Sequence, residues 1–597
     1  NASASLALNG SRLVGAYASG ADSFHVTLHL TESQRTNILY KSKTPGGDYS
    51  GTVMKLFPSC IHDVAQVKNS IIEFVNLTEI ADSVPPSLYS ASIALSHGYL
   101  TIRATETLDL SPFTVAKFNI SKFYLSESIG SQNVSLHGST VIANGYDMEY
   151  VVVELTEEQR VAAILMSGTP GGDGDAVFVE SEIASFTDIG QLKNVNASTV
   201  IVNETLDSVA PSITNATLKF GLGTLVLTAS ETLLLSSQQH VNFSKIVIRN
   251  DDSDPGIRLT GASVNEYNAL KATINLLETQ RIPLLYVSGV PGGDGTAVRI
   301  DFEHGAFLDV GLNPSNLVEN FTAFEEPDNI PPKIESGSIN YTDGVLRIKA
   351  DEYIDSTPIS LVNLSLIDLA DISQDRAVRL NGAGIVSKDG EVLTLILTEL
   401  QRAKAIALSA VQGGNGGATI LDTFPGSLTD ITGGNRISSL TATSLTEVAD
   451  SRRPTLGSGE IDYNNGKLTL NASETLDVDN APTASGFNLS LAYISDQTTF
   501  FNVSLGASSM INVDGTMITI MLTELQRVRS IAISGTPGGN GGAIVLDAYE
   551  GFVQDVGRLN AFQKFDISIN EIPDTTPPVV LSAQMNYSTG VLKVNVS

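Results

Sequence analysis

Alternating apolar and polar residues recur along the chain at nearly constant intervals. Side chains that alternate with a period of two lie on one face of a β-strand. Each alternating segment follows a proline and a turn that contains glycine, so we predict a half-buried strand near the start of each copy. The apolar positions of these segments are Leu100, Ile102 and Ala104; Leu225, Leu227 and Ala229; Leu346, Ile348 and Ala350; Leu468, Leu470 and Ala472; and Leu592, Val594 and Val596.

A second recurring pattern predicts a short helix. It reads TEEQRVAAILMSGTPGGDG at 156–174, and similar segments begin at Thr31, Leu277, Thr398 and Thr523. Thr followed three residues later by Gln is a capping box. The apolar run after it is about two helical turns long, and Gly-Gly-Asp/Asn is typical of the turn that ends a helix. The copy with Leu277 at the cap position lacks the side-chain acceptor, so we expect a weaker cap there.

The period of these patterns indicates one domain copied in tandem. The arginines of the helix pattern, which we take as the signature of the repeat, are 125, 121, 121 and 125 residues apart; repeats of fixed length indicate separate, similar units. They are Arg35, Arg160, Arg281, Arg402 and Arg527.

Five proline-containing segments of the form E-x-x-D are expected to be stiff linkers between the domains, because proline fixes φ and cannot extend a ladder. They lie at 79–86, 204–211, 325–332, 447–454 and 571–578. We therefore predict a partial repeat without its opening strands at 1–84, complete repeats at 85–210, 211–331, 332–453 and 454–576, and the opening strands of a further repeat at 577–597. On this interpretation the sequence is part of a longer polypeptide.

The fold class that these elements predict is all-β. About seven short strands and one helical turn in each repeat of about 120 residues are typical of an Ig-like β-sandwich. A small β-barrel or a jelly roll is the alternative, which the short linkers disfavour.

Composition excludes two classes of protein. The net charge of −30 and pI of about 4.5 argue against nucleic-acid binding, which needs a basic surface. The chain contains no run of 18 apolar residues, so we predict no membrane span in this segment.

Acceptor sites for N-glycosylation are unusually frequent. The chain has 17 N-x-S/T sequons, whereas its Asn, Ser and Thr content gives about seven by chance. The alternative is that Asn simply suits turns. Asn119, Asn242, Asn363 and Asn488 follow the repeat spacing, which favours a secreted, glycosylated surface. The full set is Asn1, Asn9, Asn76, Asn119, Asn133, Asn196, Asn203, Asn215, Asn242, Asn320, Asn340, Asn363, Asn471, Asn488, Asn502, Asn586 and Asn595.

The segments DTTPPVVLSAQMNYSTGVLKVNVS and NNGKLTLNASETLD resemble the Ig-like repeats of giant extracellular proteins. Bacterial adhesins and surface-layer proteins carry similar segments, and so do cell-surface proteins of algae and protists, including flagellar-hair (mastigoneme) proteins. The resemblance implies a structural or adhesive role outside the cell.

Catalysis is not expected. The seven histidines occupy different positions of the repeat, and no Ser/His/Asp set or pair of metal-binding histidines recurs. The GGDG loop lacks the G-K-[ST] of a phosphate loop.

Two interpretations of the recurrent charges stay open. Hard oxygen ligands at the domain junctions would bind calcium, with Glu204, Asp207 and Glu231 as candidates for one junction. Alternatively, the recurrent Arg pairs with a recurrent carboxylate such as Asp63, Asp188, Asp309, Asp430 or Asp555. Further recurrent candidates for calcium ligands are the strand carboxylates Glu106, Glu352 and Glu474 and the loop residues Asp48, Asp173 and Asp294.

These patterns give two expected functions. The first is a structural subunit of an extracellular, N-glycosylated filament or fibre, such as a flagellar hair, whose partners are copies of itself or other fibre subunits. The second is a calcium-stiffened adhesin stalk or surface-layer protein. No cofactor is expected apart from calcium at the domain junctions, and the expected modification is N-linked glycans. Donation of the 577–597 strands to a neighbouring chain is a further hypothesis, which we disfavour against a continuous chain.

Overall fold

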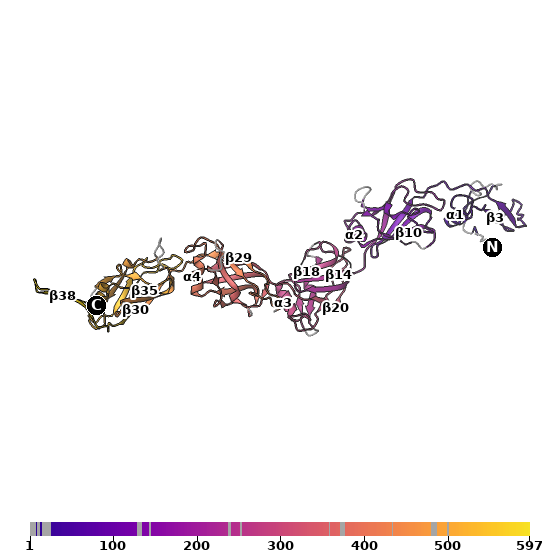
Figure 1. Cartoon of the computed structure of the whole chain (residues 1–597). Helices are drawn as coiled ribbons and strands as arrows, with labels where there is room; N and C mark the ends of the chain where they lie inside the picture. Colours follow the sequence, from indigo (N-terminus) through magenta and orange to yellow (C-terminus); the bar gives the residue numbers. More distant parts are fainter. Residues whose placement is uncertain are drawn as a thin grey trace. The chain divides into compact units, whose positions relative to one another are not determined.

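The computed structural model describes residues 7–8, 12–14, 25–127, 134–142, 145–236, 240–250, 254–357, 359–369, 376–432, 434–478, 486–497 and 501–597 (Figure 1). The chain forms two compact units. The first contains residues 1–289 and 296–326, and the second contains residues 290–295 and 327–597. Each unit spans more than one of the predicted repeats, so the division into six parts stays a prediction.

The first unit contains three groups of elements. Residues 12–76 form β1 (Arg12–Val14), β2 (Thr27–His29), α1 (Glu32–Leu39), β3 (Val53–Leu56) and β4 (Glu73–Asn76). Residues 88–205 form β5 (Leu88–Ala94), β6 (Tyr99–Leu108), the 3-10 turn η1 (Ile120–Lys122), β7 (Phe123–Ser126), β8 (Val134–Ser135), β9 (Thr140–Ile142), β10 (Met148–Glu154), α2 (Glu157–Leu165), β11 (Phe178–Ser181) and β12 (Ser198–Thr205). Residues 213–326 form β13 (Ile213–Lys219), β14 (Thr224–Leu233), η3 (Phe243–Lys245), β15 (Ile246–Arg249), β16 (Ile257–Arg258), β17 (Ser263–Val264), β18 (Ala269–Asn275), α3 (Glu278–Tyr286), β19 (Arg299–Phe302), β20 (Val318–Thr322) and β21 (Phe324–Glu326).

The second unit repeats the same order of elements. Residues 334–448 form β22 (Ile334–Asn340), β23 (Val345–Ile354), η4 (Leu361–Asn363), β24 (Leu364–Asp368), β25 (Val378–Arg379), β26 (Gly384–Ile385), β27 (Gly390–Ile396), α4 (Glu399–Ala407), β28 (Thr419–Thr423) and β29 (Thr441–Val448). Residues 456–596 form β30 (Leu456–Asp462), β31 (Lys467–Leu476), η6 (Leu489–Leu491), β32 (Ala492–Asp496), β33 (Asn502–Ser504), β34 (Ser509–Met510), β35 (Gly515–Met521), α5 (Glu524–Ala532), β36 (Ile544–Ala548), β37 (Lys564–Ile572), β38 (Val580–Asn586) and β39 (Val591–Val596).

Each complete set of strands forms a two-sheet sandwich. In residues 88–205 the strand order is β8-β7-β11-β12-β5-β6-β10-β9. The first half of β12 pairs antiparallel with β11, and its second half pairs parallel with β5. One strand therefore connects the two sheets, whose inner faces share one apolar core that includes Leu100 and Ile102 of β6 and Val179 of β11. The order recurs in residues 334–448 and 456–572.

The second sandwich along the chain differs in one detail. In residues 213–326 the last strand is broken into β20 and β21, so the two sheets are separate, with five and four strands. In every sandwich the order of the described strands is open, which distinguishes it from a closed barrel. The predicted fold class, all-β with Ig-like sandwiches, is confirmed.

The alternating strands were predicted correctly with one exception. In β6, β14, β23 and β31 the predicted apolar positions are buried or half-buried, and most are fully buried. In β39 the residues Leu592, Val594 and Val596 are exposed instead. The reason is that β39 pairs only with β38, and among the described residues no second sheet covers this hairpin.

The predicted capping boxes are present in α1, α2, α4 and α5. In α2 the Thr156 hydroxyl accepts the Gln159 backbone N–H at 3.3 Å, and the Gln159 side chain accepts the Thr156 N–H at 2.8 Å. The Gln159 amide also donates to the carbonyls of Ser135 and His137, which attaches the helix to the sheet. In α3 only the Gln280 half is formed, since Leu277 has no side-chain acceptor.

Two substitutions test the capping. Thr398→Ala removes the hydroxyl that accepts the Gln401 N–H and should destabilise α4 by about 1 kcal/mol. Leu277→Thr completes the box of α3 and should stabilise that helix by a similar amount. Hydrogen–deuterium exchange of peptides from each helix measures both effects. Unchanged exchange in both variants would contradict the prediction.

Candidate functional site at the repeat junctions

Four segments meet where one repeat follows another. They are the helix of the first repeat, the linker, and a strand and a loop of the second repeat. At the junction after α2 these segments supply Arg160, Asp207, Glu231 and Asp309. Arg160 lies one turn after Glu157, so the two side chains share a face of the helix.

The Arg160 guanidinium uses all five of its N–H donors. Its Nε and one Nη donate to the two oxygens of Glu157, at 2.6 and 2.8 Å. The remaining donors bind the Leu95 carbonyl at 3.2 Å, Asp207 at 2.7 Å and Glu231 at 3.1 Å. A buried arginine is stable only when its donors are paired, and here the partners come from both repeats.

Glu157 connects the two repeats a second time. Its Oε1 accepts the backbone N–H of Thr232, which lies on β14 of the following repeat, at 2.8 Å. Sequence reasoning missed this residue, although a Glu precedes the signature Arg by three positions in every copy. These residues are Glu32, Glu157, Glu278, Glu399 and Glu524.

The same arrangement recurs at the junction after α4. Arg402 donates to Glu399, the Tyr341 carbonyl, Asp450 and Glu474, again with all five donors. Glu399 accepts the Thr475 N–H at 2.7 Å.

The other signature arginines form parts of this arrangement. Arg35 binds Glu32, Asp82 and Glu106. Within the first unit Arg281 donates to Glu278 and to the Phe220 carbonyl. Arg527 binds Glu524, the Tyr463 carbonyl and Asp574.

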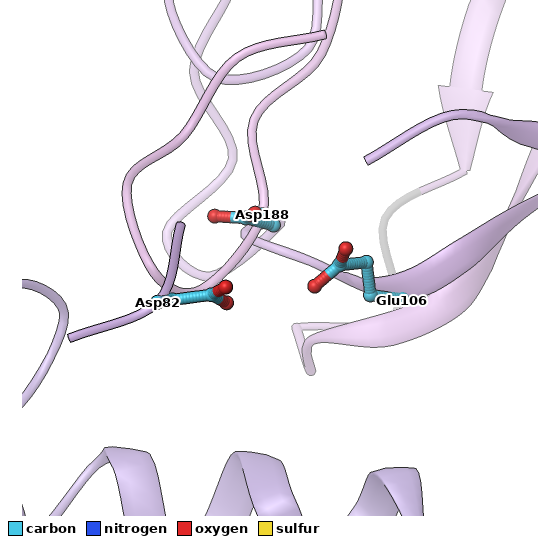
Figure 2. Close-up of side chains that lie close together, drawn as sticks. All are labelled: Asp82, Glu106 and Asp188. Atoms are coloured by element: carbon cyan, nitrogen blue, oxygen red, sulfur yellow. The ribbon is translucent and has the colours of Figure 1, made fainter. Parts of the chain in front are cut away.

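Three carboxylates gather at the start of the following repeat. At each of four junctions the linker Asp, the strand Glu and a loop Asp of the next repeat each offer one oxygen, and these oxygens lie within 4.8 Å of one another. Figure 2 shows the side chains of one such cluster, each from a different segment of the chain. We call these sets the carboxylate clusters; they are Asp82/Glu106/Asp188, Asp207/Glu231/Asp309, Asp328/Glu352/Asp430 and Asp450/Glu474/Asp555.

Burial changes the acidity of the cluster members. It raises the pKa of Glu231 to about 7, although the neighbouring Arg160 opposes the change. It raises the pKa of Glu106 and of Glu474 to about 7 in the same way, and that of Asp188 and of Asp555 to about 6. Burial acts on Glu157 as well, but the hydrogen bonds from Arg160 and Thr232 hold its pKa below the usual value.

The glycine pair of the loop after the helix is explained by packing. Gly171 has φ +93°, and a Cβ at this position would lie 1.9 Å from the Val310 carbonyl oxygen of the next repeat. A Cβ on Gly172 would lie 2.0 Å from the Ser167 carbonyl oxygen, at the end of its own helix. Gly46 and Gly413 approach the next repeat in the same way as Gly171. The first glycine therefore permits contact between repeats, a role that sequence reasoning did not assign.

Of the three residues that the sequence suggested as calcium ligands at one junction, the structure brings two together and places the third elsewhere. Asp207 and Glu231 lie together, and Asp309 joins them. Glu204 is not in the cluster, because its carboxylate accepts the N–H groups of Gly168 and Val177 at 3.0 and 2.7 Å. It braces the loop after α2 instead.

Two further expectations about the recurrent acids were wrong in detail. The loop residues Asp48 and Asp173 accept N–H groups of their own turns; they and Asp294 are outside the carboxylate clusters. The predicted Arg–carboxylate pairing exists. At the junctions after α2 and α4, however, the acids that bind the arginine are the helix Glu, the linker Asp and the strand Glu. The loop acids Asp188, Asp309, Asp430 and Asp555 complete the clusters, whereas Asp63 accepts the Val67 N–H in an exposed turn.

The sequon asparagines in the described residues are exposed or half-buried, while Asn1, Asn9 and Asn133 lie outside these residues.

Four sequon asparagines follow the repeat spacing, but only three of them occupy the same structural position. Asn119, Asn242 and Asn488 precede a 3-10 turn. The corresponding residue of the fourth copy is Ser360, and Asn363 ends the turn. In this copy the sequon lies three residues later relative to the 3-10 turn, and the spacing in the sequence does not show this shift.

Among the comparisons with known proteins, only the comparison with solved structures found similar proteins. No family model matches the chain, and no curated protein does. The N-terminal part of the bacterial S-layer protein SbsC is 14% identical at a TM-score of 0.15, with 33% of this chain and 45% of that chain covered. The four N-terminal Ig domains of Dscam1 are 10% identical at a TM-score of 0.14, with 74% and 94% covered. At these TM-scores the likenesses support no inference about function.

Of the helices in the described residues, none combines the length and the apolar character needed to cross a membrane.

Replacing the junction arginine should destabilise the connection between repeats. Arg160→Met leaves Glu157, Asp207 and Glu231 without their cation, and breaking a buried ion pair in this way costs about 3–5 kcal/mol. Arg527→Met is the matched control, because Arg527 and Asp574 are 21% and 29% exposed while Arg160 and Asp207 are 7% and 1% exposed. Its cost should be below about 1 kcal/mol.

Hydrogen exchange of the linker peptides and of the peptides from β14 reads out the difference between these variants. If the two substitutions increase exchange equally, burial of the arginine adds nothing to the stability of the junction and the prediction is wrong.

Two alanine substitutions separate the effect of the contact between repeats from the effect of backbone strain. Gly171→Ala and Gly538→Ala both place a side chain at strongly positive φ, +93° and +96°, so their intrinsic strain is similar. The added methyl collides with Val310 in the first variant, whereas at Gly538 its nearest neighbour is an Ile531 side-chain carbon at 3.5 Å. We expect Gly171→Ala to lower the thermal unfolding midpoint more than Gly538→Ala. Equal shifts would show that the contact with Val310 contributes nothing.

Proposed function

We propose that the chain is a load-bearing segment of an extracellular, N-glycosylated cell-surface filament or fibre. The observation that carries this proposal is the buried arginine junction, which binds successive repeats to one another after α2 and after α4. Domains that act as independent modules need no such connection, because interdomain contacts in flexible arrays are small and polar. A segment that transmits force benefits from junctions that resist bending and separation.

The surface chemistry supports the same proposal. The sequon asparagines in the described residues are exposed or half-buried, as glycan attachment requires of the surface. The net charge of −30 keeps a long array soluble, and glycans would cover sheet edges that could otherwise pair between chains. Assembly partners are then copies of the same chain or other fibre subunits, brought together at the glycan-free surfaces.

A cation-stiffened adhesin stalk is the second candidate. The carboxylate clusters favour it, because they place acidic oxygens at the same junctions that set the stiffness of the array. A stalk would be an extended monomer, whereas a fibre subunit assembles regularly with its neighbours.

Secretion of the chain from a eukaryotic cell line tests the glycosylation. Peptide-N-glycosidase should lower its mass, and glycopeptides should carry sugar at exposed sites such as Asn203 and Asn215. Thr205→Val destroys the N-x-S/T sequon of Asn203 and should eliminate the glycan at that site alone. Unmodified sequons in the secreted chain would refute the glycosylated surface.

Negative-stain electron microscopy of the same material separates the two candidates. Regular filaments or laterally associated fibres support the proposal. Single, unassociated particles at all concentrations contradict the fibre and favour the stalk.

A further inference from the structure

We propose that the carboxylate clusters are binding sites for calcium ions that join each repeat to the next. This inference concerns the ligand of the junctions, and it stands independently of whether the chain forms a fibre. If the junctions bind no calcium, they are held by the arginine alone and the proposed function is unaffected.

The first argument is charge. The junction after α4 contains Glu399, Asp450, Glu474 and Asp555 around the single guanidinium of Arg402. Four carboxylates against one cation leave a formal excess of three negative charges. The side chains of Asp450 and Glu474 are 1% and 6% exposed and Asp555 is fully buried, whereas Glu399 is 33% exposed. An uncompensated buried charge is unfavourable by several kcal/mol per ion, so a further positive charge, from a proton or a metal ion, would stabilise the junction.

The second argument is the presence of buried oxygens without partners. Glu474 is 4% exposed and Asp555 is fully buried, yet Glu474 Oε1 and Asp555 Oδ2 accept no hydrogen bond from the described residues. The same holds for Asp188 Oδ2 and Glu231 Oε1 at two other junctions. Buried carboxylate oxygens are normally paired, and the clusters leave unpaired ones where three acidic groups converge.

The third argument is the kind of ligand and its spacing. Each cluster offers carboxylate oxygens from three separate segments, without His or Cys; hard oxygen ligands suit Ca²⁺ or Mg²⁺ and exclude a zinc-type site. The oxygens of each cluster lie no more than 4.8 Å apart, so a single ion can contact all three. Ca²⁺ is the better candidate because it accepts irregular sets of protein oxygens, whereas Mg²⁺ demands near-octahedral geometry and usually keeps several of its waters.

The geometry also assigns a consequence to binding. The ligands of each site come from the linker and from a strand and a loop of the following repeat. After α2 and after α4 the arginine connects two of these ligands to the preceding helix. A bound ion would therefore fix the linker on the following repeat while the guanidinium holds the preceding one. Removing the ion should loosen the junction and leave each sandwich folded.

Calcium titration of the full chain tests the proposal directly. After dialysis against EDTA and then metal-free buffer, isothermal titration and native mass spectrometry should count four Ca²⁺ per chain, one for each cluster. Saturating Ca²⁺ should raise the thermal unfolding midpoint and slow hydrogen exchange in the linkers. MgCl₂ at the same concentration should do so less.

Two conservative variants locate the ions. Glu474→Gln removes one of the three carboxylates of its cluster and should reduce the count from four to three. Glu204→Gln is the matched control, because Glu204 belongs to a linker but braces a loop away from the cluster; it should keep all four ions.

Three results would overturn the proposal. They are no calcium bound to the wild-type chain, a count unchanged by Glu474→Gln, and equal stabilisation by Mg²⁺ and Ca²⁺. The wild-type count needs no variant, so it decides the matter even if Glu474→Gln fails to fold.

Discussion

The structure depends on burying one arginine side chain at the boundaries between repeats after α2 and after α4. A guanidinium removed from water must have its donors paired, and no single repeat supplies enough acceptors. Arg160 obtains Glu157 and the Leu95 carbonyl from its own repeat, and Glu231 from the next. Neither repeat reaches its full set of interactions alone. Neighbouring repeats are thus coupled in their stability, as in other arrays whose interfaces contribute to each unit.

The glycine loop and the arginine act on the same contact. Gly171 lets the loop after α2 approach the backbone at Val310, the residue that directly follows Asp309 of the cluster. A larger residue would hold that loop away and separate the acids from the guanidinium. The close backbone packing and the charged network therefore require each other, which explains why arginine and glycine pair recur together in the sequence.

Local rules were enough to predict the elements of the fold but not the partners of the junction. Strand alternation and capping boxes depend on residues close in sequence, and both were predicted well. Glu204 and Asp207 lie three residues apart in one linker, and only the fold shows that Asp207 faces the arginine while Glu204 turns to Gly168. Glu157 recurred visibly, but its contact with Thr232 spans two repeats and follows from no local pattern. Asn363 kept the spacing of the repeat although Ser360 holds the structural position.

The excess of negative charge belongs to the assembled junction and not to any repeat. At Arg527 the acidic partners are the helix Glu524 and the linker Asp574; the arginine and Asp574 are partly exposed, and water can screen them. Docking of a following repeat buries the arginine and brings the two further acids into the same place, as at Arg402. The repulsion therefore arises only when repeats dock. Anything that neutralises these acids, whether a proton or a metal ion, acts on the connection between repeats and leaves the sandwich cores unchanged.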